Sequence, residues 1–419
     1  MTPRMLKQTL EEWSREVHVP ADLADRALRH RSRLRLTRFA GVVACAAVVA
    51  AVALLVPLVV VPLLDKAPVS QVGGPPVVVP VQPYRQTTPA QDVLADTENS
   101  PPKTMIAAGR VAVSAYYTRR VRTVAGRKML DRTWYLLDQV TGSYEKTEWG
   151  WVEVAPGLRW AAVLEKELPV RRIGIFDMET RRVRAWVPVD QPVGGVSWSR
   201  DGTRLVATAY DESPDLDRTS VDEQRCPARV AATPEDPRLP PQMISTSRTG
   251  FYVVDAATAT AGDFHAVDPC LTDNSNMRRD FGWSDDGTLV REASNIWKRP
   301  DAFYDLDGRP HDAPAGYVVT ESKAGVSPDG TLLAGPDGMP TKVTELSTGK
   351  VVGRQQVLQL LAWADDRRLV ALGCADTCGS EFHNGLVLVG VDGEDMVQLS
   401  VYRKNSQEAG TWQPALTPR

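Results

Sequence analysis

A short motif of Ser, Asp, Gly and Thr recurs in this sequence, and its side chains could bind a metal ion or transfer a proton. The motif occurs as SRDGT, SDDGT and SPDGT. Its Ser, Asp and Gly residues are Ser199, Asp201, Gly202, Ser284, Asp286, Gly287, Ser327, Asp329 and Gly330. Carboxylates that recur in this way could form a ring of cation ligands or act as general acids.

Turn formation is the alternative role of the motif, and we favour it. An Asp-Gly pair reaches positive φ at low cost, and Ser and Asp side chains accept hydrogen bonds from nearby backbone N–H groups. A fourth copy contains Asp366 followed by Arg367 instead of glycine, so its turn need not have the same conformation. We interpret the motif residues as structural.

Other patterns for catalysis or metal binding are missing from the sequence. It contains no G-x-S-x-G, no H-E-x-x-H and no P-loop. His265, His311 and His383 are far apart, and DLDG at 305–308 matches only part of a calcium loop and is interpreted as a hairpin turn. We predict no catalytic residue, no metal site and no cofactor.

Four cysteines in the C-terminal part of the chain favour disulfide bonds. They are Cys226, Cys270, Cys374 and Cys378, and an even number is typical of proteins in an oxidising compartment. A Cys226–Cys270 bond would staple a long loop, and a Cys374–Cys378 bond would close a short one. Zinc binding and free thiols are the alternatives, although the spacing is not that of paired C-x-x-C knuckles.

The N-terminal part of the chain predicts a membrane anchor. Phe39–Leu64 has no charged residue and would span about 39 Å as a helix, more than the hydrocarbon core requires. Residues 1–38 are basic and are expected to be helical, and the six arginines between Arg26 and Arg38 predict that this segment stays in the cytoplasm. We therefore expect an uncleaved signal anchor in the plasma membrane, with the remaining chain extracytoplasmic.

Beyond the anchor, the sequence predicts a stalk followed by an all-β domain. Residues 65–103 are rich in Pro and Val and are expected to form an extended stalk. In residues 104–402 the motif recurs at intervals of about 40 residues, with Val154, Trp198, Trp283, Val326 and Trp363 at the equivalent position. The tryptophans at this position are expected to pack between adjacent sheets. One interval of about 85 residues contains the polar stretch 211–248, which we interpret as an inserted loop.

Two hairpins per repeat predict the four-stranded blades of a β-propeller. We count six blades, or seven if the tail 403–419 forms a partial blade rather than a closing strand. The Trp-Ser-x-Asp-Gly-Thr pattern resembles the propeller repeats of TolB-like and WD-repeat-like bacterial proteins. That resemblance implies a propeller fold but no particular activity, since propellers have many functions.

The predicted function is that of a non-enzymatic module that binds a protein or a small ligand on one propeller face. A formal net charge of −3 gives no reason to expect nucleic-acid binding. Two alternatives remain: a sensor that signals through residues 1–38, motivated by the apolar stripe of Leu6, Leu10, Trp13 and Val17, and an enzyme with its site in the central channel.

Overall fold

The computed structural model describes residues 78–85, 92–217, 243–245, 247–268, 270–272, 278–294, 300–376, 383–403 and 411–419. All of them belong to the unit Gly73–Arg419. The predicted cytoplasmic segment 1–38 and the predicted membrane span 39–64 lie outside the described residues. Within the described part, no helix has the length and apolarity needed to cross a membrane.

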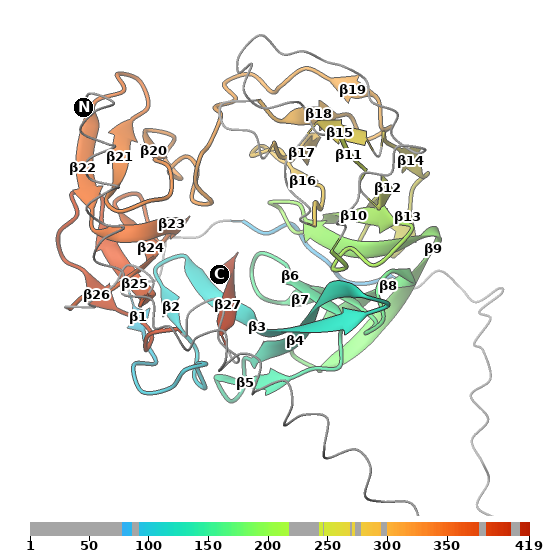
Figure 1. Cartoon of the computed structure of the whole chain (residues 1–419), viewed down its shortest axis with the longest axis horizontal. Coiled ribbons are helices and arrows are strands. Elements are labelled where there is room, and N and C mark those ends of the chain that lie inside the picture. The colour runs from blue at the N-terminus through green and yellow to red at the C-terminus, as the bar shows by residue number, and fades with distance from the viewer. Residues whose placement is uncertain are drawn as a thin grey trace, which may run out of the picture. The chain divides into compact units, whose positions relative to one another are not determined.

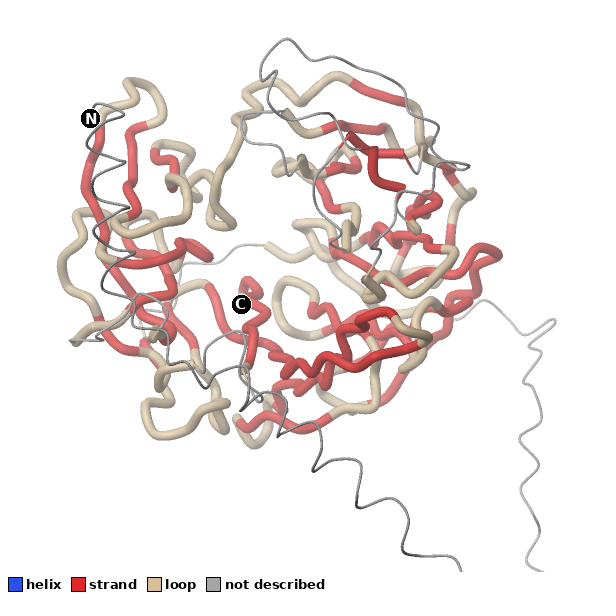
Figure 2. Tube along the Cα trace, in the orientation of Figure 1, coloured by secondary structure: helices blue, strands red, loops and turns tan. Residues whose placement is uncertain are grey.

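The described chain consists of strands joined by turns and loops (Figures 1 and 2). The first sheet contains β1 (Val93–Leu94), β2 (Ala107–Ala108), β3 (Val111–Val124), β4 (Arg127–Asp138), β5 (Ser143–Lys146) and β27 (Trp412–Pro418). The second contains β6 (Trp151–Val154), β7 (Trp160–Leu164), β8 (Val170–Asp177), β9 (Arg182–Trp198), β10 (Arg204–Tyr210), β12 (Arg248–Asp255), β13 (Thr260–Ala261) and β14 (His265–Ala266).

Four smaller sheets follow along the chain, and each is made of antiparallel strands. The two-stranded sheet pairs β11 (Met243–Ser245) with β15 (Cys270–Thr272). The next contains β16 (Gly282–Trp283), β17 (Val290–Glu292), β18 (Ala302–Tyr304) and β19 (Pro310–His311). The last two are β20 (Leu332–Ala334), β21 (Thr341–Glu345) and β22 (Val351–Gln355), and then β23 (Val357–Trp363), β24 (Arg368–Gly373), β25 (Gly385–Gly390) and β26 (Val397–Gln398).

Strand β9 belongs to two groups of four strands. Its first part, from Arg182 to Pro188, pairs with β8, and its last part, from Val193 to Trp198, pairs with β10. The same strand is thus the last of one four-stranded group and the first of the next. Two groups of four that share β9 account for seven strands of the second sheet, and β14, which also pairs with β12, is the eighth.

Many of these strands are buried on both faces. All five residues of β7 are buried, as are six of the seven residues of β10. Burial on both faces requires a neighbouring layer on each side of the sheet, which is the situation of a blade between two other blades. The apolar run WAAVL and the run LVATAY, in which Thr208 is the one polar residue besides the tyrosine hydroxyl, reflect that environment.

Successive groups of strands share hydrophobic cores. The core around Val163 joins β3 and β4 to β6–β8, and the core around Val206 joins β10 and β12 to β16 and β17. A further core contains residues of β3, β24, β25 and β27, so the first and last sheets also pack together. The strand order and the shared cores define a propeller-like arrangement. Among the described residues, no such core joins β16–β19 to β20–β22.

Three tryptophans at the same repeat position bond to the preceding group of strands. Each indole Nε1–H donates to the carbonyl of the residue just before the equivalent position of the preceding repeat. The pairs are Trp198 and Glu153 (2.9 Å), Trp283 and Ser197 (3.0 Å), and Trp363 and Gly325 (3.4 Å). The sequence predicts packing between neighbouring sheets at this position, and the hydrogen bonds show that packing directly.

The C-terminal strand pairs with the first long strand of the unit. Strand β27 is antiparallel to β3 from Trp412, opposite Thr118, to Pro418, opposite Val111. The tail therefore contributes a strand to the first sheet. Of the two possibilities that the sequence left open, a closing strand or a partial blade, the structure shows the strand. Because Trp412 is fully buried in the core shared by the first and last sheets, this pairing also joins the two ends of the unit.

Part of the predicted stalk is packed against the strands instead of standing free. The Val79 side chain is buried in the core of β7–β12, and its N–H donates to the Ala257 carbonyl at 2.8 Å. Further along, the Asp96 carboxylate accepts hydrogen bonds from the N–H groups of Lys103 (2.7 Å) and Thr104 (3.0 Å). The apolar and turn-forming residues of this segment therefore extend the folded unit toward its N-terminus, before the predicted boundary at residue 104.

Antiparallel pairing gives each group of strands two different ends. The connections between its first and second strands all lie at one end, and those between its second and third strands lie at the other. The first kind are tight turns, at 155–159, 199–203, 284–288 and 364–367. The Gly157 N–H donates to the Pro418 carbonyl and the Arg110 N–H donates to the Ala364 carbonyl, so the turns 155–159 and 364–367 both lie beside one end of the first sheet. We call the surface formed by these turns the tight-turn face.

The opposite ends carry the longer connections, and we call them the long-loop face. The longest are the inserted loop and residues 374–384. Residues 165–169, which are as short as the tight turns, and the turn of the β3–β4 hairpin at 125–126 lie at the same ends. The inserted loop leaves β10 after Tyr210 and returns at β12, and the Asp211 N–H donates to the Ser247 carbonyl at its base. Residues 218–242 of the loop lie outside the described residues.

The inter-sheet tryptophan bond gives a stability prediction. Trp283→Phe removes the indole donor and leaves the Ser197 carbonyl without its partner. We expect a loss of about 1–3 kcal/mol in the free energy of unfolding, measured by urea titration. The control is Trp186→Phe, at a half-buried tryptophan that stacks on Arg172 and keeps this aromatic contact as phenylalanine. Equal losses in both variants would contradict a specific contribution of the Trp283 bond.

Candidate functional site

In the structure, the recurring carboxylates accept hydrogen bonds from residues of their own turns. The Asp201 Oδ1 accepts hydrogen bonds from the Ser199 hydroxyl (2.6 Å) and from the Thr203 N–H (3.1 Å) and hydroxyl (2.8 Å). Gly202 has a φ of 67°, which explains the need for glycine at this point. The same contacts, with distances within 0.1 Å, recur around Asp286 and Asp329.

These hydrogen bonds stabilise the charged form of each carboxyl group. The bond from the Ser284 hydroxyl, followed by those from Thr288, lowers the pKa of Asp286, and Ser327 and Thr331 do the same for Asp329. Each carboxylate belongs to a different turn. Among the described residues, no three His, Cys, Asp or Glu side chains gather as a metal site would require. The geometry of the motif is that of a turn.

The fourth copy of the motif uses a different aspartate. Asp365, one residue earlier than the aligned position, accepts the N–H groups of Arg367 and Arg368 at 2.8 Å. Asp366 instead lies 3.4 Å from Arg110, near the start of β3. The turn without glycine thus has its own hydrogen-bond pattern, and its free carboxylate pairs with the first sheet.

Only part of the cysteine prediction falls on described residues. Cys374 is disulfide-bonded, and its Sγ lies 3.1 Å from the Tyr402 hydroxyl. Cys226 and Cys378 lie outside the described residues. The backbone of Cys270 pairs with that of Ser245, at the end of the inserted loop. A bond from Cys226 to Cys270 thus stays a prediction, and the β11–β15 pairing brings the two ends of that region together.

The three histidines occupy separate places, and each contacts its immediate surroundings. The His265 ring packs beside Phe251, at 5.2 Å between centroids, and a Cβ on Gly308 of the DLDG turn would meet it at 2.4 Å. The His311 Nδ1 lies 2.7 Å from the Asp312 carbonyl oxygen. His383 packs on Tyr402. In the turn itself, the Asp305 carboxylate accepts backbone N–H groups, as expected of a hairpin.

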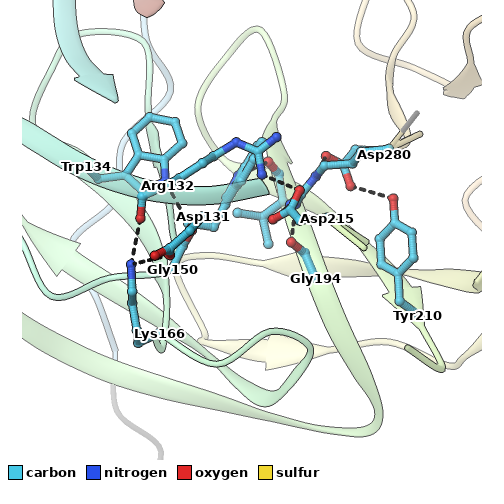
Figure 3. Close-up of polar contacts among 12 residues, drawn as sticks. Asp131, Arg132, Trp134, Gly150, Lys166, Gly194, Tyr210, Asp215 and Asp280 are labelled. Carbon is cyan, nitrogen blue, oxygen red and sulfur yellow. Dashed lines mark hydrogen bonds and ion pairs between the residues drawn. The ribbon is translucent and has the colours of Figure 1, made fainter. Parts of the chain in front are cut away.

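A buried network of charges on the long-loop side was missed by the sequence analysis (Figure 3). Asp215 forms ion pairs with both Arg132 and Arg278, and all three side chains are about nine-tenths buried. Arg278 also donates to Asp280 at 2.6 Å, and the Tyr210 hydroxyl donates to the same carboxylate at 2.8 Å. The network thus joins three segments that are far apart in the sequence: β4, the end of β10 with the start of the inserted loop, and residues 278–280.

The surroundings of Arg278 show why the network can be buried. Its guanidinium lies 3.6 Å from the centre of the Trp151 ring and donates to the Gly194 carbonyl. A Cβ on Gly195 would lie 2.2 Å from the Asp280 carboxylate, so only glycine leaves room for the ion pair. No sequence motif predicts this arrangement, because its members are single charged residues whose neighbours are set by the tertiary fold.

Glu153, on β6, lies near this network, and the pKa of its carboxyl group is raised. Removal from water, followed by the nearby Asp280 charge, raises the pKa of Glu153 to about 8, although Arg278 opposes the change. The neutral form is therefore the stable one in the folded chain near neutral pH. Its backbone carbonyl accepts the Trp198 indole, which ties this residue to the contact between groups of strands.

The hollow that the described residues form beside the network is small. It lies between Arg132, Lys166 and Ser213 and has a volume of about 20 Å³, which is room for about one water molecule. The arginines and carboxylates largely compensate one another, and Tyr210 is held by Asp280. We interpret these residues as fixing the position of neighbouring elements.

The element that the network positions is the outer part of the β3–β4 hairpin. Arg132 comes from β4, and Asp215 comes from the first residues of the inserted loop. The Leu130 N–H donates to the Asp215 carbonyl at 2.9 Å, and the Asp217 N–H donates to the Lys128 carbonyl at 2.7 Å. Arg127 forms a two-point ion pair with Glu212, at 2.5 and 3.2 Å. The hairpin and the base of the inserted loop together form the candidate binding site.

Replacing Glu153 tests the electrostatics of this region. Because the folded pKa of Glu153 exceeds its ordinary value of 4.5, its contribution to stability is present at low pH and is lost as the pH rises toward about 8. Glu153→Gln should therefore gain stability relative to the parent chain between pH 5 and pH 8. Thermal unfolding across this range measures the difference.

The control for that measurement is Glu165→Gln, since a hydrogen bond from Arg172 lowers the pKa of Glu165. This variant should show no such gain with rising pH. A stability difference for Glu153→Gln that does not change between pH 5 and pH 8 would contradict the raised pKa.

The cysteine prediction can be tested by mass spectrometry of the full chain after alkylation, with and without reductant. We expect Cys226, Cys270, Cys374 and Cys378 to be alkylated only after reduction, whereas Cys45 provides an internal control that needs none. Four reactive thiols among these positions in the unreduced protein would rule out both bonds.

Comparison with known proteins assigns no family. No protein-family model matches the chain, and neither does any curated protein. Similar solved structures include TolB from Acinetobacter baumannii, with 15% identity over 74% of this chain and 67% of that one and a TM-score of 0.36. Others are hydrazine synthase from Kuenenia stuttgartiensis (14% identity, 61% and 68% covered, TM-score 0.33) and the mitotic checkpoint complex (13%, 84% and 88%, 0.33). Sequence identities and TM-scores this low assign no function, and the propeller-like fold rests on the sheets and their shared cores.

Proposed function

We propose that this chain is a membrane-anchored, extracytoplasmic β-propeller that binds a protein partner through its long-loop face, without catalysis. Six blades account best for the strand groups: β27 with β3–β5, β6–β9, β9–β13, β16–β19, β20–β22 with the bridge at Val326, and β23–β26. The anchor rests on the apolar sequence Phe39–Leu64 and the arginines before it.

The path of residues 78–85 is the observation that favours the long-loop face as the binding face. The Tyr84 N–H donates to the Asp201 carbonyl at 2.7 Å, its hydroxyl donates to the Arg419 carbonyl at 3.2 Å, and its ring contacts Gly157. All three partners belong to the tight-turn face. A chain that arrives from a membrane across this face would leave the long-loop face directed away from the bilayer.

The contents of the two faces favour the same choice. The tight-turn face consists of short turns, and in three of them the Ser, Asp and Thr side chains bond within their own turn. The long-loop face has the inserted loop, the projecting hairpin and Cys374. Loops on a rigid scaffold are the usual place of binding residues. The buried charges of Arg132, Arg278, Asp215 and Asp280 compensate each other, which favours binding over catalysis.

Photo-crosslinking in intact cells tests the proposed face. A photoreactive residue is placed at Lys128 or Glu167 on the long-loop face, or at Asp307 or Asp392. The last two lie in the turns β18–β19 and β25–β26, between the third and fourth strands of a group, which antiparallel pairing places at the tight-turn end; all four residues are exposed. We expect a discrete crosslinked partner from the first pair of positions only. Crosslinks from the tight turns alone, or none from either face, would contradict the proposal.

A further inference from the structure

The β3–β4 hairpin extends beyond the strands that flank it. β27 pairs with β3 only as far as Thr118, and β5 pairs with β4 only as far as Tyr135. The hairpin continues to its turn at residues 125–126. Its outer part, RRVRTVAGRKMLDR, has six basic residues and one acidic residue.

One edge of this outer hairpin already binds an acidic, extended segment. Residues 211–217, DESPDLD, lie along β4, with a bridge between Met129 and Leu216 and two backbone hydrogen bonds beside it. Ion pairs from Arg127 to Glu212 and from Arg132 to Asp215 accompany the pairing. The chain itself thus shows which ligand chemistry this hairpin accepts.

The other edge, formed by residues 120–124 of β3, pairs with no strand among the described residues. Val121 is 61% exposed there, and the Arg120 side chain is 77% exposed. An exposed aliphatic residue on an unpaired edge is unfavourable unless something covers it, since such edges accept further strands. The neighbouring arginines favour an acidic occupant over a neutral one.

We propose that the β3 edge of this hairpin binds an extended acidic segment of a protein partner by strand addition. Backbone hydrogen bonds to residues 120–124 provide the pairing. The exposed Arg120, whose guanidinium lies 3.6 Å from Asp131, contacts a carboxylate on the partner, and Val121 packs against an aliphatic side chain of the partner. The proposal rests on the long-loop face being the binding face, and it names the chemistry of the partner.

The test uses the full chain in detergent and an eight-residue peptide of alternating Glu and Val, with affinity measured by fluorescence anisotropy. Arg120→Glu and Val121→Glu should each weaken binding at least tenfold. Arg184→Glu, at an exposed arginine on β9, is the matched control and should change binding less than twofold. Circular dichroism checks that each variant is folded.

A second peptide separates strand addition from attraction between charges. Methylation of alternate backbone nitrogens removes the hydrogen-bond donors along one edge of the peptide and keeps every charge. Because strand addition needs those donors, the methylated peptide should not bind. Equal affinity of the methylated peptide, or of inorganic polyphosphate, would overturn the proposal in favour of unspecific anion binding.

The competing occupant is the chain's own segment 404–410, which precedes β27 and lies outside the described residues. If the peptide binds only after this segment is replaced by Gly and Ser, the edge belongs to the chain itself and the proposal is wrong. If the full chain does not bind the peptide but a partner still crosslinks at Glu167, the β3 edge is not the binding site, whereas the long-loop face remains the binding face.

Discussion

The pairing of β27 with β3 is the interaction on which the arrangement of the other sheets depends. Strands such as β7 and β10 are buried on both faces, so each group of strands needs a neighbour on either side. The first and last sheets are far apart in the sequence, so no short connection makes them neighbours. The C-terminal strand joins them, because it pairs with β3 and brings Trp412 into a core that both sheets share. Without it, β3 would present an unpaired edge along its buried part.

Once the strands alternate in direction, the surface divides into two faces of different chemistry. Ser, Asp and Gly turns that satisfy their own hydrogen bonds form one face, and residues 78–85 pack on it through Tyr84. The long connections are at the opposite ends. A network of buried arginines and carboxylates then fixes the β3–β4 hairpin against the base of the inserted loop. The binding proposal follows from this separation.

The features predicted from sequence are those with a local physical cause. Repeating Asp-Gly turns and alternating apolar residues predict strands and their spacing, because a turn at positive φ and a buried strand face each require particular residue types. The Trp198 position was predicted to pack between sheets for the same reason. The features that were missed depend on residues brought together by the fold. Arg278 meets Asp215 and Trp151 across long separations, and Gly195 is needed only because Asp280 lies above it.

The boundary of the folded unit shows the same limit. Proline-rich composition predicts an extended chain for residues 65–103, and an extended chain can also pack. Val79 is buried because a core formed by β7–β12 has space for it, which no property of the local sequence shows.

Energy transfer from the folded unit to a bilayer tests the orientation of the two faces most directly. A single fluorophore is attached at Asp307 in a tight turn or at Lys128 on the hairpin, in the full chain reconstituted in vesicles with acceptor-labelled headgroups. The account predicts strong transfer from position 307 and weak transfer from position 128. Stronger transfer from position 128, or none from either position, would contradict it.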